Sequence, residues 1–374
     1  MAEVSPFIYD GPLPPDDVDG RDDIVDELLS LGQAGRFVRL YAPRRYGKTS
    51  VLRRVAAVAP RKRPAQPVVM VDLYGLVSMA DMAIRLETAY RNLPDGRWRR
   101  EISRAFAGAG LGLSLAGAGI SAQFAKRDAS DPLPILHATL DLPLKAVPDG
   151  TRALVIFDEF QAVQSVPELD AIIRSHIQHQ REVASFVFAG SEQGMLNALF
   201  ADVAKPLYGQ ATPLELTRLP DDVVADIIDR KFRLTNRNPG DALAPLVKLA
   251  DGHPQRAMLL AHLLWVQTRT GKRSTVVDFD AALEVAMSQS APEMTTMWGS
   301  LDPNESRVLR AIAYDGSPYR KETAALLGLK KATAADAVKR LISASVIEES
   351  AGVSSYRIID PFLKEWIRRR LPEL

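Results

Sequence analysis

Residues 42–49 (APRRYGKT) have the side chains and spacing of a loop that binds phosphate groups. They fit the pattern G-x-x-x-x-G-K-[ST] at every fixed position except the first, where Ala42 replaces glycine. In such a loop, backbone N–H groups and the N-terminus of the following helix bind phosphate oxygens. Lys48 is expected to reach the β- and γ-phosphates of ATP, and the Thr49 hydroxyl to ligate Mg²⁺. The pattern therefore predicts a site for ATP and Mg²⁺.

The whole loop and the residue after it are expected to line the nucleotide: Ala42, Pro43, Arg44, Arg45, Tyr46, Gly47, Lys48, Thr49 and Ser50. Ala42 adds only one methyl group where glycine is favoured, so the loop can still close. Arg44 and Arg45 could pair with phosphates or a carboxylate, because guanidinium groups favour bidentate contacts with anions. The alternative is that both are solvated at the rim of the site.

A pair of carboxylates, Asp158 and Glu159, follows the apolar run 154–157 (LVIF). Alone, the pair could be an acidic turn after a core strand. Given the upstream loop, we expect Asp158 to be the Mg²⁺-side carboxylate and Glu159 to be the general base or water-orienting residue. Lys48 and Glu159 are thus the predicted catalytic residues.

A third polar position, Ser191, follows the apolar run 185–189 (SFVFA). A polar residue at the carboxyl end of a parallel strand lies in the ligand crevice of an open α/β sheet. Ser191 could therefore sense a γ-phosphate or the attacking water. It could equally cap the next helix.

The elements that must position these residues follow from hydrophobic periodicity. Strands are expected at 36–41, 68–73, 153–157 and 185–189, and helices at 19–31, 50–58 and 79–90. Because continuous apolar strands alternate with helices, we expect a parallel sheet covered on both faces. The predicted fold class is α/β.

After residue 219 only helices are expected, at 221–232, 242–250 and 255–267. A third unit opens near Met297, with helices at 303–314, 321–327 and 333–343 before two short strand-like segments. Three helices and then a β-hairpin is the order of a winged helix. The predicted domains are therefore 1–219, 220–296 and 297–374.

The composition is that of a folded protein, with 47% hydrophobic and 25% charged residues. Cysteine is absent, which excludes disulfide scaffolds, thiolate metal sites and cysteine nucleophiles. The formal net charge of +1 gives no overall field that would attract nucleic acid or an anionic membrane. The N-terminal residues lack the basic and apolar regions of a signal peptide, so a cytoplasmic location is expected.

One segment, 105–125, is uncharged and long enough to be considered as a membrane span. Its many glycines, and leucines that alternate with Gly and Ser, favour a glycine-rich β-hairpin or insertion instead. We therefore expect no membrane partner.

Further motifs follow one another along nearly the whole chain. They are APRRYGKTSVL (42–52), DEFQ (158–161), FAGS (188–191), PLYGQATPLEL (206–216), DGHPQ (251–255) and DPFLKEWIRRR (360–370). With them the chain resembles the archaeal-type ATPases of the STAND class of P-loop NTPases, which are AAA-like. The resemblance implies an ASCE-type sheet, an all-α lid and a C-terminal winged helix. We expect the chain to be an ATPase with slow turnover. The chain departs from the family pattern at Ala42 and at Gln210, where relatives often carry arginine.

The resemblance also implies nucleotide contacts outside the loop. The lid segment Gly252–Pro254 is implied to close over the nucleotide, and Gly20 and Arg21 to lie near the adenine pocket. Arg256 follows the lid segment and could approach the γ-phosphate, or could be an exposed residue of the first helical turn.

Two classes of function fit these patterns. In the first, nucleotide state changes how the lid and winged helix pack, and so gates a protein partner or a homo-oligomer. In the second, the chain is an ATP-dependent DNA-binding protein similar to origin-recognition and loader ATPases. From Thr296 onward there are 13 basic and 10 acidic residues, a weak positive charge for a dedicated DNA-binding unit.

Overall fold

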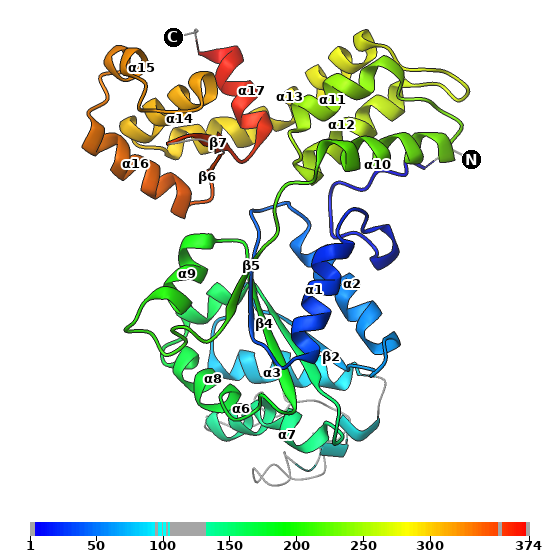
Figure 1. The fold of residues 1–374 in the computed structure, drawn as a ribbon, viewed down its shortest axis with the longest axis vertical. Coiled ribbons are helices and arrows are strands. Elements are labelled where there is room, and N and C mark those ends of the chain that lie inside the picture. The colour runs from blue at the N-terminus through cyan, green and yellow to red at the C-terminus, as the bar shows by residue number, and fades with distance from the viewer. Residues whose placement is uncertain are drawn as a thin grey trace.

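A five-stranded parallel sheet lies at the centre of the first half of the chain in the computed structural model (Figure 1). Its strands are β1 (Val38–Tyr41), β2 (Val68–Asp72), β3 (Ala153–Asp158), β4 (Ala184–Gly190) and β5 (Thr212–Glu215). They lie in the order β2-β3-β4-β1-β5, and each neighbouring pair is parallel. Since all five strands run the same way, their carboxyl ends meet at one edge.

The structure describes residues 4–93, 96–98, 100–101, 104, 132–350 and 354–371. Segment 105–125, for which the sequence predicts a glycine-rich β-hairpin or an insertion, lies outside these residues. Among the described residues, none of the helices has the length and apolar character needed to cross a bilayer.

Helices cover both faces of the sheet, as the continuous burial of its central strands β3 and β4 requires. They are α1 (Asp22–Gln33), α2 (Lys48–Val58), α3 (Met79–Arg91), α6 (Leu133–Leu140), α7 (Leu142–Ala146), α8 (Leu169–Ile177) and α9 (Gln193–Ala201), with short 3₁₀ helices at Pro15–Asp17, Ala59–Arg61 and Phe160–Ser165. On one face, α1 and α2 pack over Leu40, Ile156 and Val187. On the other, α3, α6, α8 and α9 pack over a core that includes Phe157 and Phe188.

The second half of the chain is largely helical. Its elements are α10 (Asp221–Leu234), a 3₁₀ helix (Gly240–Ala242), α11 (Leu243–Ala250), α12 (Pro254–Gln267), α13 (Val276–Ser300), α14 (Pro303–Asp315), α15 (Lys321–Leu326), α16 (Lys331–Ser343), β6 (Ile347–Glu349), β7 (Tyr356–Ile358) and α17 (Pro361–Arg370). Strands β6 and β7 form an antiparallel hairpin. One continuous hydrophobic core joins α10–α13 to α14–α17.

Local capping explains where two long helices of this half begin. Thr275 caps α13 and Asp302 caps α14, and each is paired with the acidic residue three positions later in a capping box. Pro303 occupies the first position of α14, where its missing N–H is not needed. Gly316, with φ of 71°, ends α14 in the left-handed conformation that favours glycine.

The four strands predicted from the sequence are β1 to β4, and the order of three helices and a hairpin near the C-terminus is observed. The fold prediction is therefore confirmed. Several elements were not predicted, among them the edge strand β5, the 25-residue helix α13, and the helices α6 to α9 and α17. The boundary predicted at 296/297 falls inside α13, and the domain limits remain predictions.

We expect Phe188→Ala to destabilise the first half of the chain by about 3–5 kcal/mol, because it leaves a cavity in a fully buried aromatic cluster. Urea unfolding followed by tryptophan fluorescence and circular dichroism tests this. The control is Val203→Ala, since Val203 is 76% exposed. A Phe188→Ala transition no earlier than the control's would contradict the packing described here.

Candidate functional site

The predicted phosphate-binding loop, residues 42–49 and from here on the phosphate loop, joins β1 to α2, so it lies at the carboxyl edge of the sheet. Gly47 is the N-cap of α2 with φ of 84°, a conformation that glycine adopts without strain. Ala42 is buried and its φ is not positive, so its methyl group is compatible with the loop. Its N–H donates to the Gly190 carbonyl at 3.3 Å, which joins the start of the loop to the end of β4.

Lys48 is only 6% exposed, and its ammonium group faces the two carboxylates that end β3. It pairs with Asp158, and it donates to Glu159 Oε1 at 2.9 Å. Burial of an ammonium group requires such partners, because an unpaired charge away from water is costly. The structure thus brings together the predicted lysine and both predicted carboxylates.

Thr49 and Asp158 supply the oxygen atoms expected around a magnesium ion. The Thr49 hydroxyl donates to Asp158 Oδ2 at 2.8 Å. Among the described residues, no group of three or more His, Asp or Glu side chains is placed to hold a metal alone. Mg²⁺ usually keeps several waters and binds through one or two carboxylates plus substrate phosphates, so the donor set fits it.

Glu159 begins the turn after β3 with φ of 53°, and its carboxylate is held at both oxygens. Oε1 accepts from Lys48, whereas Oε2 accepts from Gln161 Nε2 at 2.5 Å and from the Ser191 hydroxyl at 2.9 Å. Burial alone would raise its pKa, but the Lys48 charge and these three hydrogen bonds together hold the pKa of Glu159 below its ordinary value. Glu159 is therefore a carboxylate at neutral pH, able to accept a proton.

The Ser191 hydroxyl therefore contacts a carboxylate and does not cap α9, whose N-cap is Glu192. Capping is thus the wrong alternative of the two. Arg44 pairs with Glu192 at 2.8 Å, and Arg45 pairs with Glu293 of α13 at 2.9 Å. Both loop arginines therefore contact carboxylates, and with 73% of Arg44 and 42% of Arg45 exposed, both are also solvated at the rim, so each of the two expectations is met.

These groups line a cavity of about 880 Å³, a size suited to a nucleotide. The predicted residues that line it are Pro43, Arg44, Arg45, Gly47, Lys48, Thr49, Ser50, Glu159, Ser191 and Pro254. The cavity, its buried lysine and its oxygen donors fit a nucleotide that carries Mg²⁺.

The remaining predicted residues lie behind this lining. Gly20 faces Val223 of α10, and Arg21 donates to the Tyr46 carbonyl at 3.5 Å, neither of them at the cavity wall. Tyr46 is buried and its ring lies edge-on to His253, with centroids 5.0 Å apart. Ala42 and Asp158 are also buried beneath the surface of the cavity.

Arg256 differs from both expectations. Its side chain is neither at the cavity wall nor exposed: only 3% is accessible, and its guanidinium binds Asp360 at the start of α17 at 2.5 Å. The exposed alternative is wrong because Asp360 is available to neutralise the charge. The partner lies 104 residues away in sequence, so no local pattern could indicate it.

Part of the cavity wall was not predicted. The N-terminal segment 8–13 lines it, and the Leu13 N–H donates to the Ser50 hydroxyl at 2.9 Å. Tyr9 in this segment packs on His262 of α12, with ring centroids 5.0 Å apart. Gln161 and Met258 also line the wall. The segment carries no nucleotide motif, so only its long-range contacts reveal the role.

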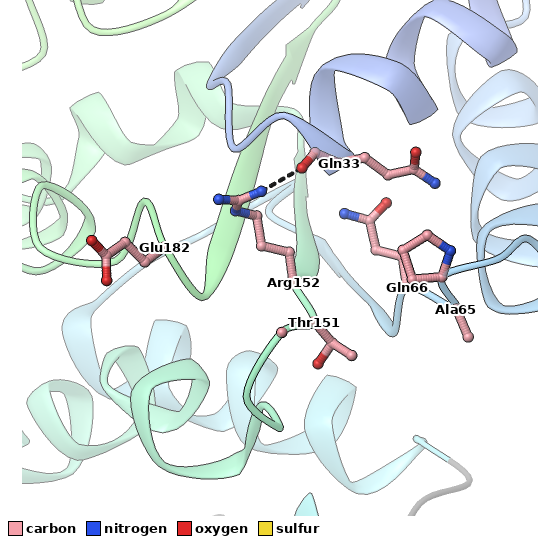
Figure 2. Close-up of a pocket in the computed structure, with 8 residues that line it drawn as sticks. Gln33, Ala65, Gln66, Thr151, Arg152 and Glu182 are labelled. Atoms are coloured by element: carbon pink, nitrogen blue, oxygen red, sulfur yellow. Dashed lines mark hydrogen bonds between the residues drawn. The ribbon is translucent and has the colours of Figure 1, made fainter.

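A second, smaller cavity of about 150 Å³ lies at the opposite, amino edge of the sheet (Figure 2). Arg152 donates there to the carbonyls of Gln33 and Arg181. The side chain of Gln66 is buried beside it, with no hydrogen-bond partner for its amide among the described residues. None of the predicted site residues lines this cavity.

Comparisons with known proteins agree on the fold. No protein-family model and no curated protein sequence matches the chain. Among solved structures, a Walker-type ATPase of Pyrococcus abyssi is similar over 97% of this chain and 99% of its own, with 19% identity and a TM-score of 0.68. The ORC2 protein of Aeropyrum pernix, solved in ADPNP and ADP complexes, covers 97% and 98%, with 14% identity and a TM-score of 0.53. The chain therefore has the fold of archaeal P-loop ATPases.

We expect Lys48→Ala to reduce ATP affinity at least about 100-fold, because it removes charge-assisted hydrogen bonds of about 1.5–3 kcal/mol each. Isothermal titration calorimetry measures the loss. Lys62→Ala is the matched control, since Lys62 is exposed and pairs with Asp26 on the surface. Unchanged ATP affinity in Lys48→Ala would show that the loop does not bind phosphate.

The two carboxylates are expected to give different phenotypes. Asp158→Asn should weaken Mg²⁺-dependent nucleotide binding, whereas Glu159→Gln should bind ATP normally and hydrolyse it about 10²–10⁴-fold more slowly, the range of a lost general base. Binding titrations with and without Mg²⁺, together with phosphate-release rates, separate the two effects. If both variants lost only binding, the assigned division of roles would be wrong.

Proposed function

We propose that the protein is a STAND-type ATPase switch, which binds and hydrolyses ATP with Mg²⁺ and gates a protein partner or a homo-oligomer through its lid and winged helix. The observation that carries the proposal is a line of charged contacts from the phosphate loop to the C-terminal unit. Arg45 of the loop pairs with Glu293 of α13, Glu293 lies 3.6 Å from Arg256 of α12, and Arg256 pairs with Asp360.

The chemistry of hydrolysis is supported by the groups around Glu159. In this reaction a water oxygen bonds to the γ-phosphorus, the bond to the bridging oxygen breaks with its electron pair leaving on ADP, and Glu159 accepts a water proton. Lys48 supplies positive charge where negative charge develops. Mg²⁺, when bound, supplies further charge neutralisation at the phosphates.

The pair of Arg256 and Asp360, at the C-terminal end of this line of charged contacts, is stronger than the pair of Arg45 and Glu293. Arg256 is buried, and its guanidinium also lies over the Phe362 ring at 4.6 Å. Burial alone would raise the pKa of Asp360, but Arg256 and the neighbouring donors hold that pKa below its ordinary value. Removal of one partner of such a buried pair typically costs about 3–5 kcal/mol. The pair therefore fixes α12, which lies in the predicted lid (residues 220–296), to α17.

Two further contacts join the C-terminal unit to the rest of the protein. In the linker after β5, Arg218 donates to Glu348 at 2.5 Å, to Asp251 at 3.1 Å and to the Ile358 and Ile359 carbonyls at 3.0 Å. Helix α16 lies against α9 (Figure 1), so closely that a Cβ on Gly194 would lie 2.9 Å from a backbone oxygen of α16. Nucleotide-driven movement of α9 or the linker would thus reach the C-terminal unit.

A nucleotide supplies the differential contact that a switch needs. In the structure, the cations of the phosphate loop are paired with carboxylates: Arg45 pairs with Glu293, and Lys48 pairs with Asp158 and Glu159. A γ-phosphate competes with these carboxylates, and ADP lacks that group. A tenfold shift in a conformational equilibrium needs only about 1.4 kcal/mol, which one charge-assisted hydrogen bond supplies.

The second candidate is an ATP-dependent DNA-binding protein. The exposed Lys330 and Lys331 at the start of α16 favour it. The contact of the other end of α16 with α9 favours the switch. Titration of duplex DNA at several salt concentrations separates the two, because each phosphate contact steepens the fall of affinity with salt.

We expect Asp360→Asn and Arg256→Ala to have opposite effects on ATP preference. Asp360→Asn frees Arg256 for the γ-phosphate and should raise the ratio of ATP to ADP affinity, whereas Arg256→Ala should lower it and leave ADP affinity nearly unchanged. Calorimetry gives the affinities, and hydrogen exchange of α10–α13 in ATP and ADP gives the conformational response. Arg233→Ala, which removes an exposed pair with Asp229 on the same unit, is the control.

Two outcomes would contradict these expectations. If ATP and ADP protected α10–α13 equally in the unmodified protein, nucleotide state would not control the lid, and the switch would be excluded. If Asp360→Asn lowered ATP preference as Arg256→Ala does, Arg256 would only fix α12 to α17 and would not bind phosphate.

A further inference from the structure

Gln161 is a buried polar residue of the cavity wall that stands directly against the predicted general base. It is the second residue of the 3₁₀ helix after β3, and only 8% of it is exposed. Its Nε2 donates to Glu159 Oε2 at 2.5 Å, which is shorter than the 2.9 Å contact from Ser191 to the same oxygen. Gln161 therefore holds the side of Glu159 that Lys48 does not reach.

The orientation of the Gln161 side-chain amide is fixed by Gly190 and Glu159. A Cβ on Gly190 would lie 2.5 Å from Gln161 Oε1, so the amide fits only because position 190, at the end of β4, has no side chain. Oε1 is buried and has no hydrogen-bond partner among the described residues. Turning the amide over would place this oxygen against the Glu159 carboxylate, where two acceptors repel. The N–H side must therefore face Glu159.

A buried acceptor without a partner costs about 1–3 kcal/mol, which a side chain present only to fill space would not incur. A residue of the same length without polar atoms would fill the position more cheaply. The polar group at 161 is thus explained by what its nitrogen does, which is to orient the carboxylate of Glu159.

We infer that Gln161 is a positioning residue for ATP hydrolysis, fixing Glu159 toward the reacting water after Lys48 has moved its charge to the phosphates. This inference rests on the proposed ATPase function. In the structure, Lys48 holds Oε1 of Glu159, and a nucleotide takes Lys48 away. The donors on Oε2 then remain, and a general base acts only when it is held within hydrogen-bond reach of its proton.

The experiment compares Gln161→Met with Gln161→Ala and with Gly190→Ala. Met keeps the length of the side chain and loses the donor, so a purely packing role predicts near-normal activity. The positioning role predicts that Gln161→Met and Gln161→Ala both lower kcat about 10–100-fold, with KM for ATP and calorimetric affinity for ADP within about twofold of the unmodified protein. Gly190→Ala displaces the amide and should lower kcat in the same way.

Two controls match these variants. Gln164→Ala alters the same 3₁₀ helix at an exposed glutamine that donates to the Met195 carbonyl, and Gly299→Ala adds a methyl group where none of the described residues lies within 4 Å. Both should leave kcat unchanged. Thermal unfolding of every variant checks that loss of turnover is not loss of fold.

A double variant at positions 161 and 159 provides a readout that a packing role of Gln161 would not change. If Gln161 acts through Glu159, Gln161→Met should slow the residual hydrolysis of Glu159→Gln far less than it slows the unmodified enzyme. Equal losses in both backgrounds, or normal kcat in Gln161→Met, would overturn the inference and leave the ATPase function standing. Absence of ATP hydrolysis by the unmodified protein would overturn the proposed function and the inference together.

Discussion

The buried charge of Lys48 is the constraint on which the site depends. An ammonium group that is 6% exposed must have anionic partners, and the structure supplies them from the end of a different strand. The pairing with Asp158 and Glu159 therefore joins the phosphate loop to β3. Under the proposed function, it also means that the phosphates of a nucleotide must replace the carboxylates around Lys48, and each carboxylate released becomes available for a cation or a proton.

The parallel sheet makes this exchange possible. The phosphate loop follows β1, the two carboxylates end β3, and Ser191 follows β4, which lies between β3 and β1. Because parallel strands end at a common edge, three segments distant in sequence meet around one cavity. Strands β3 and β4 are fully buried and, apart from Ser185 at the amino end of β4, carry only apolar residues and glycine before Asp158 and Ser191 at this edge.

The same burial explains how much the sequence could predict. Continuous apolar runs such as 153–157 mark central strands clearly, and a lysine that follows glycine between a strand and a helix has few other roles. Strand β5 escaped prediction because it lies at the edge of the sheet, with three of its four residues exposed. Helix α13 escaped because apolar residues such as Val277 and Val285 also stand on its exposed side, which weakens the contrast with its buried face. Contacts such as Arg256–Asp360 and Leu13–Ser50 depend on tertiary structure alone.

The two ends of the line of charged contacts differ in strength, and this determines what a nucleotide can change first. Arg45 and Glu293 are 42% and 49% exposed, and a pair with such exposure contributes about 0–1 kcal/mol. Arg256 is 3% exposed, and its pair with Asp360 is held in a closed environment. Under the proposed function, a phosphate in the cavity therefore separates Arg45 from Glu293 at little cost, before it draws on the buried pair of Arg256 and Asp360. The lid and the C-terminal unit, which share one hydrophobic core, should then respond together, with α13 as the element that first loses its contact to the phosphate loop.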